Sequence, residues 1–506
     1  MLDLRNARRI GIIGGGIVGW LAAIALSRVF DPAVEVTVIE TTALFPLGLG
    51  EGGSLNLIDT LCRNDLDLDV FIGEAGATYK HGVLYENWTG GGVPDRYYHL
   101  FGGPGIPEIE HHVDGFFPLL SARIAVGASL HTCIPGFEAI ARNASHQEID
   151  ELMATGQSGL YPSYHFDDIG FEQYLKRVGL ARGITSRESP VCDIRLDNRG
   201  HACALQLQGE QLEVDFAVDA SGLARMGLGT AFNPHWRSFA NVLPTDQAIT
   251  FDLQPAGSSR QPLTRSTAMT AGWIWEVPLN RTTKAGYVFS SRHADHTMAI
   301  AEVQHRFGCD VQPRRELSFD QGYLETAWVN NVVALGTASG FVEPLGAALA
   351  AHTFEQLRNL ERILTNGGGI APAQAIEAFN RANVRSWTGV RDYLRLHYNG
   401  SRNDTPFWRD LASAELPESY AQLRACFQKR TPRFIDIEPY VGSGWQSLFH
   451  QVDWISVAAP LGVVPSTAAR AELSQLPMEW QSKAQAYLDL LKGTSPTFRP
   501  RSGWRH

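Results

Sequence analysis

The chain has 506 residues, of which 44% are hydrophobic and 19% are charged, the composition of an ordinary folded protein. This length is more than one core needs and predicts two or three structural modules. The formal net charge of -10 argues against nucleic acid as a main partner. The early apolar run at 17–26 is shorter than the roughly 20 residues that cross a bilayer, so we expect neither a signal peptide nor a membrane span.

Cysteine and histidine usage points to a reducing setting without a metal site. The cysteines are scattered and form no Cys-x-x-Cys pair, which predicts a cytoplasmic protein rather than a disulfide framework. His111-His112 is the only adjacent histidine pair. Since no carboxylate or third histidine lies at helical spacing from it, we interpret it as a loop feature.

The N-terminal segment has the pattern strand, glycine turn, helix. Residues 10–13 are apolar and lead into Gly14-Gly15-Gly16-Ile17-Val18-Gly19, and an apolar helix pattern follows. Such a turn lets the backbone approach a pyrophosphate at the start of a helix. A second strand at 35–39 ends in a carboxylate that can hold ribose hydroxyls. The pattern predicts a dinucleotide site formed by Gly14, Gly16, Ile17, Val18, Gly19 and Glu40.

In two later segments a predicted strand is again followed by a glycine. One covers 216–222 and the other covers 331–336, so three distant parts of the chain predict one discontinuous nucleotide domain. This layout resembles the FAD-binding flavoprotein hydroxylase superfamily and favours FAD over NAD. In that superfamily an aspartate usually follows the last glycine, whereas here Gly336 is followed by Thr337.

A Trp-x-Trp pair lies in the segment 272–278. In a strand, Trp273 and Trp275 point to the same face. A polar stretch follows and predicts a hairpin with a second strand that includes 287–289. Two interpretations stay open at this point: the rings fill the core of an antiparallel sheet, or they form a wall between a cofactor chamber and an aromatic substrate.

Taken together, these motifs resemble the flavin-dependent halogenases, in particular the tryptophan halogenase branch. The two signatures are the glycine turn and Trp-x-Trp-x-Val-Pro, where the family usually has Ile before Pro. Gly48-Leu49-Gly50-Glu51 is similar to the family's flavin-contacting loop, and Ala77-Thr78-Tyr79-Lys80 to the segment with its essential lysine. Further matches run in order to about residue 360, at 86–88, 99–101, 164–167 and 341–345, and loosely at 443–462.

The resemblance implies a function and its residues. Reduced FAD (FADH2) and O2 oxidise a halide ion to hypohalous acid, which passes Trp273 and Trp275 to reach Lys80. Lys80 delivers it to an electron-rich, indole-type substrate, either by hydrogen bonding or as a haloamine. The resemblance places further cofactor contacts at Gly50, Glu51, Gly336 and Ala350, the halide at the backbone N–H groups of Ala348 and Leu349, and the substrate at His99, Phe101 and Trp445.

One position departs from the family pattern. Tryptophan halogenases commonly carry a second glutamate after Glu-Pro-Leu, which faces the lysine and takes up the ring proton, whereas this chain has Gly346 there. Leu47 also stands where relatives carry an arginine beside the flavin. These departures leave the choice between chloride and bromide open. Bromide is easier to oxidise, so a brominase is the expectation.

We therefore predict an α/β fold: an FAD-binding Rossmann-like domain of the glutathione reductase/hydroxylase type, an inserted mixed or antiparallel sheet and a helical C-terminal part. The FAD-binding module is expected at 1–60, 160–235 and 318–370, the substrate-facing sheet at 61–159 and 236–317, and the helical region at 371–506. Apolar spacing predicts helices at 351–366, 372–398 and 477–491. The tail 494–506 is expected to be loosely held.

No second glycine fingerprint for NADH is evident, which favours a separate NAD(P)H-dependent flavin reductase as partner. Besides a small aromatic substrate, a homodimer stays open. Two alternatives to the halogenase also remain. One is an FAD-dependent aromatic monooxygenase on the same scaffold, and the other is a flavin-binding protein that has lost catalysis.

Overall fold

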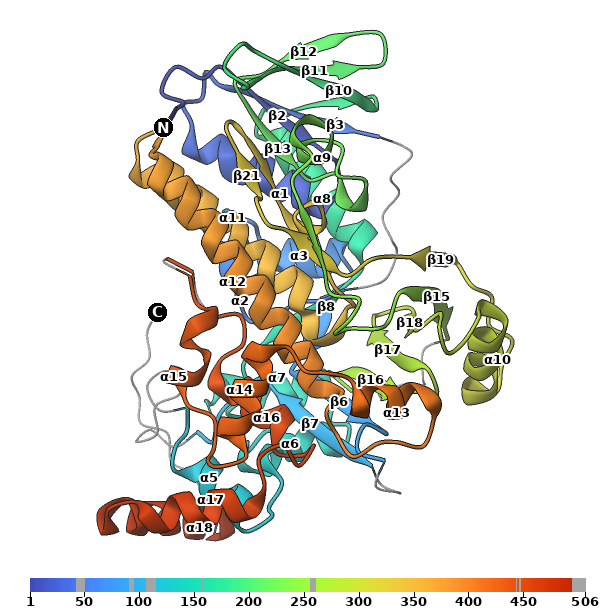
Figure 1. Ribbon diagram of the computed structural model, residues 1–506, viewed down its shortest axis with the longest axis vertical. Coiled ribbons are helices and arrows are strands. Elements are labelled where there is room, and N and C mark those ends of the chain that lie inside the picture. Colours follow the sequence, from blue (N-terminus) through green and yellow to red (C-terminus); the bar gives the residue numbers. More distant parts are fainter. Residues whose placement is uncertain are drawn as a thin grey trace.

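Two large β-sheets organise the chain in the computed structural model (Figure 1). The structure describes residues 1–41, 51–90, 95–105, 115–156, 158–254, 261–442, 444–445 and 447–493. Several positions singled out in the sequence lie outside the described residues: Leu47, Gly50, His111, His112, Ser443, the tail 494–506 and the side chain of Glu51.

The first sheet has six strands in the order β21-β22-β13-β2-β3-β9. Its neighbours are parallel except for β21 and β22. The apolar runs of its central strands are buried on both faces, as parallel strands require. The bounds are β2 (Arg9–Ile13), β3 (Glu35–Glu40), β9 (Thr185–Glu188), β13 (Phe216–Asp219), β21 (Trp328–Val329) and β22 (Val332–Ala334).

Different layers cover the two faces of this sheet. Ile10 and Ile12 pack into a core that includes α1 (Ile17–Val29), α8 (Asp168–Ala181) and α11 (Ala348–Asn366). Ile13 and Ile39 instead pack with a small sheet of β10 (Val191–Leu196), β11 (Ala202–Leu207) and β12 (Gln211–Glu213). The alternation follows from the two-residue period of a strand. The result is a helix–sheet–sheet arrangement, which confirms the predicted FAD-binding fold class.

The second sheet has seven strands in the order β19-β15-β18-β17-β16-β6-β7, antiparallel except for β16 and β6. Trp273 and Trp275 enter one core, and Ile274 enters another with α10 (His296–Phe307). The predicted shared face and hairpin are confirmed. The bounds are β6 (Gly82–Glu86), β7 (Arg96–Leu100), β15 (Gln247–Leu253), β16 (Thr264–Ala268), β17 (Gly272–Pro278), β18 (Thr283–Phe289) and β19 (Arg315–Ser318).

Three smaller sheets link these parts. The order β4-β8-β5 joins β4 (Glu51–Gly52), β8 (Ser163–Phe166) and β5 (Thr78–Lys80). A second sheet joins β14 (Trp236–Ser238), β20 (Gly322–Leu324) and β23 (Gly340–Phe341), and a third pairs β1 (Leu2–Asp3) with β24 (Ile370–Ala371).

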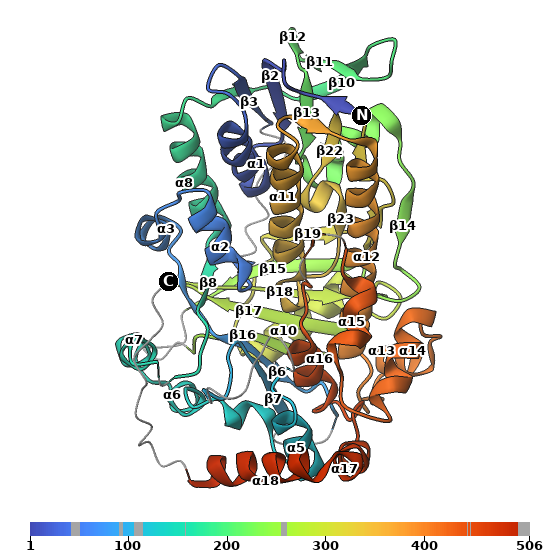
Figure 2. The same cartoon turned by 90° about the vertical axis from the view of Figure 1, so that its left-hand side faces the viewer.

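The C-terminal part is helical in the residues that the structure describes. The long α12 (Ala373–His397) runs beside α11 from the level of the first sheet to the middle of the molecule, where it packs against α16 (Figure 2). The three predicted helices are confirmed, although α11 begins at Ala348, earlier than expected. The others are α13 (Pro406–Ser413), α14 (Glu418–Phe427), α15 (Phe434–Ile437), α16 (Gln451–Ala458), α17 (Ser466–Gln475) and α18 (Met478–Gly493).

The remaining helices of the first half are short. They are α2 (Asn56–Arg63), α3 (Leu68–Glu74), α5 (Leu119–Ala125), α6 (Phe137–Ala141), α7 (His146–Ala154) and α9 (Leu228–Phe232). Within the described ranges no helix is long and apolar enough to cross a membrane. The same residues contain no group of three or more His, Cys, Asp or Glu side chains that could hold a metal ion.

Candidate active site

The glycine turn after β2 has a geometry that side chains would disrupt. Gly14 has a φ of 112°, and a Cβ there would lie 2.3 Å from the Ala220 carbonyl oxygen. A Cβ on Gly19 would lie 1.8 Å from the Gly14 oxygen, so α1 packs directly on the turn. A Cβ on Gly16, the N-cap of α1, would meet nothing nearer than Glu172 Oε2 at 4.0 Å. This open approach to a helix N-terminus suits a pyrophosphate.

A cavity of about 150 Å³ opens at the carboxyl ends of β2, β3 and β13, where parallel sheets bind nucleotides. Glu40 lies beside it against the backbone of Gly15. Its carboxylate accepts hydrogen bonds from Lys176 Nζ at 2.9 Å and from the Ser186 hydroxyl. The cavity is lined by Ile13, Gly14, Ile39, Thr41, Ser189, Pro190, Val191, Ser221, Ala224 and Met226. A carboxylate beside an apolar cavity fits the adenosine end of FAD.

Asp219, which the sequence analysis left without a role, shapes this cavity. It ends β13, is fully buried, and accepts hydrogen bonds from the Ser221 hydroxyl at 2.6 Å and the amides of Gly227 and Leu228 at 2.9 and 2.7 Å. Burial raises the pKa of Asp219, and these hydrogen bonds offset part of that rise. The carboxylate thus fixes the loop that carries Ser221, Ala224 and Met226. The sequence signal was a strand ending in Asp before Ala-Ser-Gly.

The third glycine segment closes on the first helix. A Cβ on Gly336 would lie 2.9 Å from Val18, and the Gly336 amide donates to Gln356 Oε1 at 2.9 Å. Ile17, Val18 and Ala350 are only partly buried and pack at the edge of the same core. The structure therefore brings the segments 14–19 and 336–350, in which cofactor contacts are expected, next to each other.

Lys80 lies in β5 and is only 1% exposed. Its Nζ is 5.3 Å from the centre of the Phe101 ring. A Cβ on Gly52 would lie 2.7 Å from the same nitrogen, so this glycine leaves room for the amine. The neighbouring His165 is fully buried; burial and then the Lys80 charge lower its pKa well below the usual range. The site therefore holds one amine among aromatic side chains.

His99 and Phe101 lie on the Lys80 side of β7, with ring centres 5.8 Å apart. His99 Nε2 is 2.8 Å from Asp453 Oδ1 at the start of α16. Trp445, the third expected substrate residue, lies elsewhere. Its ring contacts His352 and Phe379, between α11 and α12.

Trp273, on the Trp-x-Trp strand, forms a hydrogen bond to the segment that precedes α11. Trp273 Nε1 donates to Glu343 Oε2 at 2.8 Å, and the same oxygen accepts from Tyr398 at 2.7 Å and Thr245 at 2.9 Å. Burial raises the pKa of Glu343, although these hydrogen bonds favour the charged form. Trp273 is 1% and Trp275 3% exposed. The two rings are therefore fixed next to the expected halide segment.

The start of α11 carries the expected halide residues. Gly346 and Ala347 both have left-handed backbone angles, with φ of 69° and 56°. The amides of Ala348 and Leu349 lie in the first turn, where a helix offers no intrahelical acceptor, and the N-cap Ala347 supplies no side-chain cap. A Cβ on Gly346 would lie 3.6 Å from the Tyr393 ring and 3.9 Å from the Phe449 ring. Free amides at a helix start can bind an anion.

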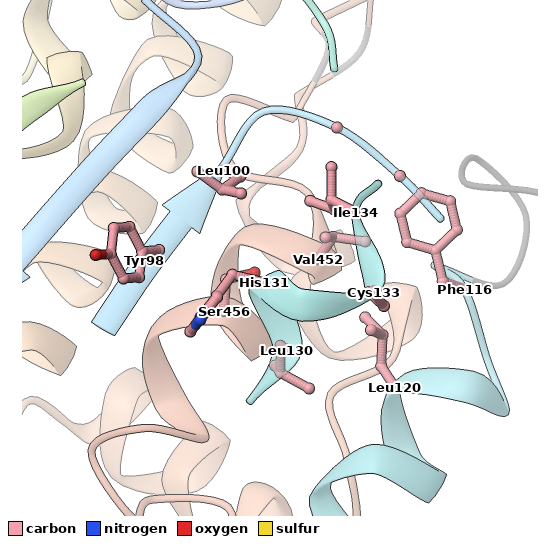
Figure 3. Close-up of a pocket in the computed structure, with 12 residues that line it drawn as sticks. Tyr98, Leu100, Phe116, Leu120, Leu130, His131, Cys133, Ile134, Val452 and Ser456 are labelled. Carbon is pink, nitrogen blue, oxygen red and sulfur yellow. The ribbon is translucent and has the colours of Figure 1, made fainter. Parts of the chain in front are cut away.

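A second pocket lies on the opposite face of β7, where Figure 3 shows Tyr98 and Leu100 from the strand with Val452 and Ser456 from α16. The 3₁₀ turn Leu130–Cys133 supplies His131 and Cys133. Because alternate strand residues face opposite sides, this pocket is separate from the Lys80 side.

The fold combines a glycine turn of the dinucleotide-binding type with a lysine that is buried against Phe101. A family model described as tryptophan halogenase matches residues 9–475. The uncharacterized protein y4xG of Sinorhizobium fredii is 73% identical over 506 residues, the full length of both chains. Tryptophan 6-halogenase SttH of Streptomyces toxytricini is 29% identical over 87% of each chain.

Solved structures agree with this assignment. The SttH crystal structure covers 96% of this chain and 97% of its own, with 24% identity and a TM-score of 0.82, which shows the shared fold. BrvH, a flavin-dependent halogenase from a Brevundimonas species, is 26% identical with a TM-score of 0.78, covering 97% of each chain. The chain belongs to the tryptophan halogenase family and is an enzyme of the flavin-dependent halogenase class.

Proposed function

We propose that this chain uses FADH2, O2 and a halide to make hypohalous acid and passes it by way of Lys80 to an electron-rich, indole-type aromatic. The observation that carries the proposal is the Lys80 amine, buried and 5.3 Å from the Phe101 ring. An amine in an apolar chamber donates hydrogen bonds to a small oxidant and keeps it from water.

The remaining residues hold and separate the reactants. The turn at Gly14, Gly16 and Gly19 would hold the pyrophosphate of FAD, and Glu40 would hold its ribose. Gly336, Ala350, Gly50 and Glu51 would be further cofactor contacts. When bound, reduced FAD with O2 supplies the oxidising equivalents for the halide. The amides of Ala348 and Leu349 would bind that halide, and Trp273 and Trp275 would keep the aromatic substrate away from the cofactor.

The substrate would pack against His99 and Phe101, whereas Trp445, which contacts His352 and Phe379 between α11 and α12, would not take part. We propose bromide as the preferred halide, because it is easier to oxidise and Gly346 leaves the site without the carboxylate of typical relatives. A separate flavin reductase would supply FADH2. All six cysteines are free, which supports a reducing, cytoplasmic setting. The proposal also divides the chain into three parts. The FAD-binding module covers 1–60, 160–235 and 318–370, the substrate-facing sheet covers 61–159 and 236–317, and the helical region covers 371–506.

The test supplies FADH2 from a flavin reductase, with O2, indole and either bromide or chloride, and identifies products by mass spectrometry. We expect bromoindole as the main product. Lys80→Met should lower halogenation by at least about 100-fold while FAD binding is kept, because it removes the donor at the oxidant. Lys284→Met is the matched control. Lys284 is also buried, but it pairs with Asp252 on the neighbouring strand of the seven-stranded sheet. Hydroxyindole would support the monooxygenase instead, and undiminished activity of Lys80→Met would refute the role of Lys80.

A further inference from the structure

One ring nitrogen of His99 forms a hydrogen bond, and the other has no partner among the described residues. Nε2 is 2.8 Å from Asp453 Oδ1, whereas Nδ1 is buried and has no hydrogen-bond partner among the residues that the structure describes. The residue is only 5% exposed. A buried nitrogen without a partner is costly, so native structures keep such groups mainly where a ligand or a reaction uses them.

Asp453 fixes which nitrogen is basic. Its second oxygen, Oδ2, accepts from the His450 amide at 2.6 Å, so the carboxylate is held in place at the start of α16. Burial alone would raise the pKa of Asp453, but the hydrogen bond from His99 and the His450 amide lower it overall. A carboxylate at Nε2 holds the proton there, and Nδ1 then presents a lone pair.

His99 Nδ1 lies near the expected position of the substrate ring, which must lose a proton when it is halogenated. The Phe101 ring is a neighbour of both His99 and Lys80, since its centre is 5.8 Å from the His99 ring and 5.3 Å from Lys80 Nζ. A substrate ring that receives the halogen at Lys80 and packs on Phe101 would therefore lie close to His99. Substitution on an aromatic ring replaces a C–H bond, so the reaction needs a proton acceptor beside that ring. Gly346 has no side chain that could act as this proton acceptor.

We propose that His99, held by Asp453, is the general base that takes the ring proton during halogenation. This inference rests on the proposed function. The halogen bonds to the ring carbon as the O–halogen bond of hypohalous acid breaks, and its electron pair leaves on oxygen as hydroxide. The ring C–H bond then breaks, its pair restores aromaticity, and His99 Nδ1 takes the proton. Transfer of this proton to hydroxide gives water, so the aromatic and hypohalous acid become the haloaromatic and water. Asp453 is a positioning residue.

The test is the deuterium isotope effect on the bromination rate at saturating substrate, measured in separate reactions with indole and with perdeuterated indole. In the wild type the base makes proton loss fast, so the effect should be near unity. His99→Gln keeps a group that can bond Asp453 but removes the base. We expect about a 100-fold lower rate and a normal primary isotope effect, because proton loss becomes rate-limiting. Asp453→Asn should raise the isotope effect in the same way, since His99 can then turn its proton to Nδ1.

His131→Gln is the matched control, because His131 is a mostly buried histidine in the separate pocket of Figure 3. It should leave the isotope effect near unity. Indole and FAD binding without turnover are measured for every variant, so a folding defect is recognised. Slower variants with an unchanged isotope effect, or variants as fast as the wild type, would overturn the role of His99. Absence of any halogenated product from the wild type would instead refute the proposed function.

Discussion

The residue that joins the two halves of the site is Glu343. One of its oxygens accepts from Trp273, Tyr398 and Thr245, and its amide donates to Gln321 Oε1 at 2.9 Å. Its other oxygen, Oε1, has no partner among the described residues. Burial disfavours the charged form and raises the pKa of Glu343, although the three donors on the first oxygen oppose this rise. Glu343 therefore acts as an acceptor that fixes Trp273 beside the start of α11.

Glu343→Gln should remove a pH-dependent loss of stability. Burial raises the pKa of Glu343 in the folded chain above its ordinary value, so its stabilising effect is full below the unfolded pKa and is lost as pH rises through the folded pKa. Glutamine mimics the neutral carboxyl at every pH. We expect a variant close to wild type near about pH 4 and more stable near about pH 8. Thermal unfolding across this range checks it.

The control for this series is Glu210→Gln, at an exposed turn between β11 and β12. It should show the same stability as the wild type at all pH values. A Glu343→Gln curve parallel to the wild-type curve would mean that Glu343 stays charged in the fold, and that the hydrogen bonds from Trp273, Tyr398 and Thr245 outweigh burial.

At the scale of elements, the junction of β2 and α1 depends on contact between backbones. Gly19→Ala would place a methyl group 1.8 Å from the Gly14 oxygen, so α1 must move away from the turn. We expect a loss of about 1–3 kcal/mol in the free energy of unfolding and at least about tenfold weaker FAD binding. Chemical denaturation and a titration with FAD measure the two effects.

Gly73→Ala serves as the matched substitution in a second helix. Gly73 lies in α3, and a Cβ there would meet nothing within 4 Å. Because alanine is the better helix former, this variant should gain up to about 1 kcal/mol and keep FAD affinity. If Gly19→Ala bound FAD as well as Gly73→Ala does, the backbone contact would not be what shapes the site.

The elements were predictable where a local period or turn determines them. The strand–turn–helix at 10–26, the shared face of Trp273 and Trp275, and the long C-terminal helices all follow from spacing. The long-range pairs did not follow. Trp273 and Glu343 are 70 positions apart, and His99 and Asp453 are 354 positions apart. No local pattern encodes such contacts, because they exist only once the sheets and helices have packed.

Trp445 is a residue whose role could not be predicted from the sequence. A large ring in an apolar stretch is equally suited to a substrate pocket and to a core, since both reward burial. Here it packs between α11 and α12. The burial of Lys80 was also not readable from its own segment, since a lysine after Thr-Tyr is ordinarily solvated. It was expected only from the resemblance of the surrounding motifs.

At the scale of the whole molecule, the candidate FAD cleft is assembled from the full first two thirds of the chain. Its parallel strands come from 9–40, 185–219 and 332–334, and α12 extends from the level of this sheet to α16 (Figure 2). A ligand bound at such a junction contacts segments that are far apart in sequence. Binding should therefore stabilise the molecule as one unit rather than a single module.

This predicts that FAD raises the unfolding temperature of the main transition. A ligand that binds only the folded chain adds about 2.7 kcal/mol at 100 times its dissociation constant, and the gain grows with the logarithm of concentration. Calorimetry with increasing FAD should show a single transition, in which both large sheets unfold, moving to higher temperature. Gly19→Ala should show a smaller shift at equal FAD. A shift of only one of two transitions, with the other left at its temperature without FAD, would show that the FAD module unfolds independently of the sheet that carries Trp273.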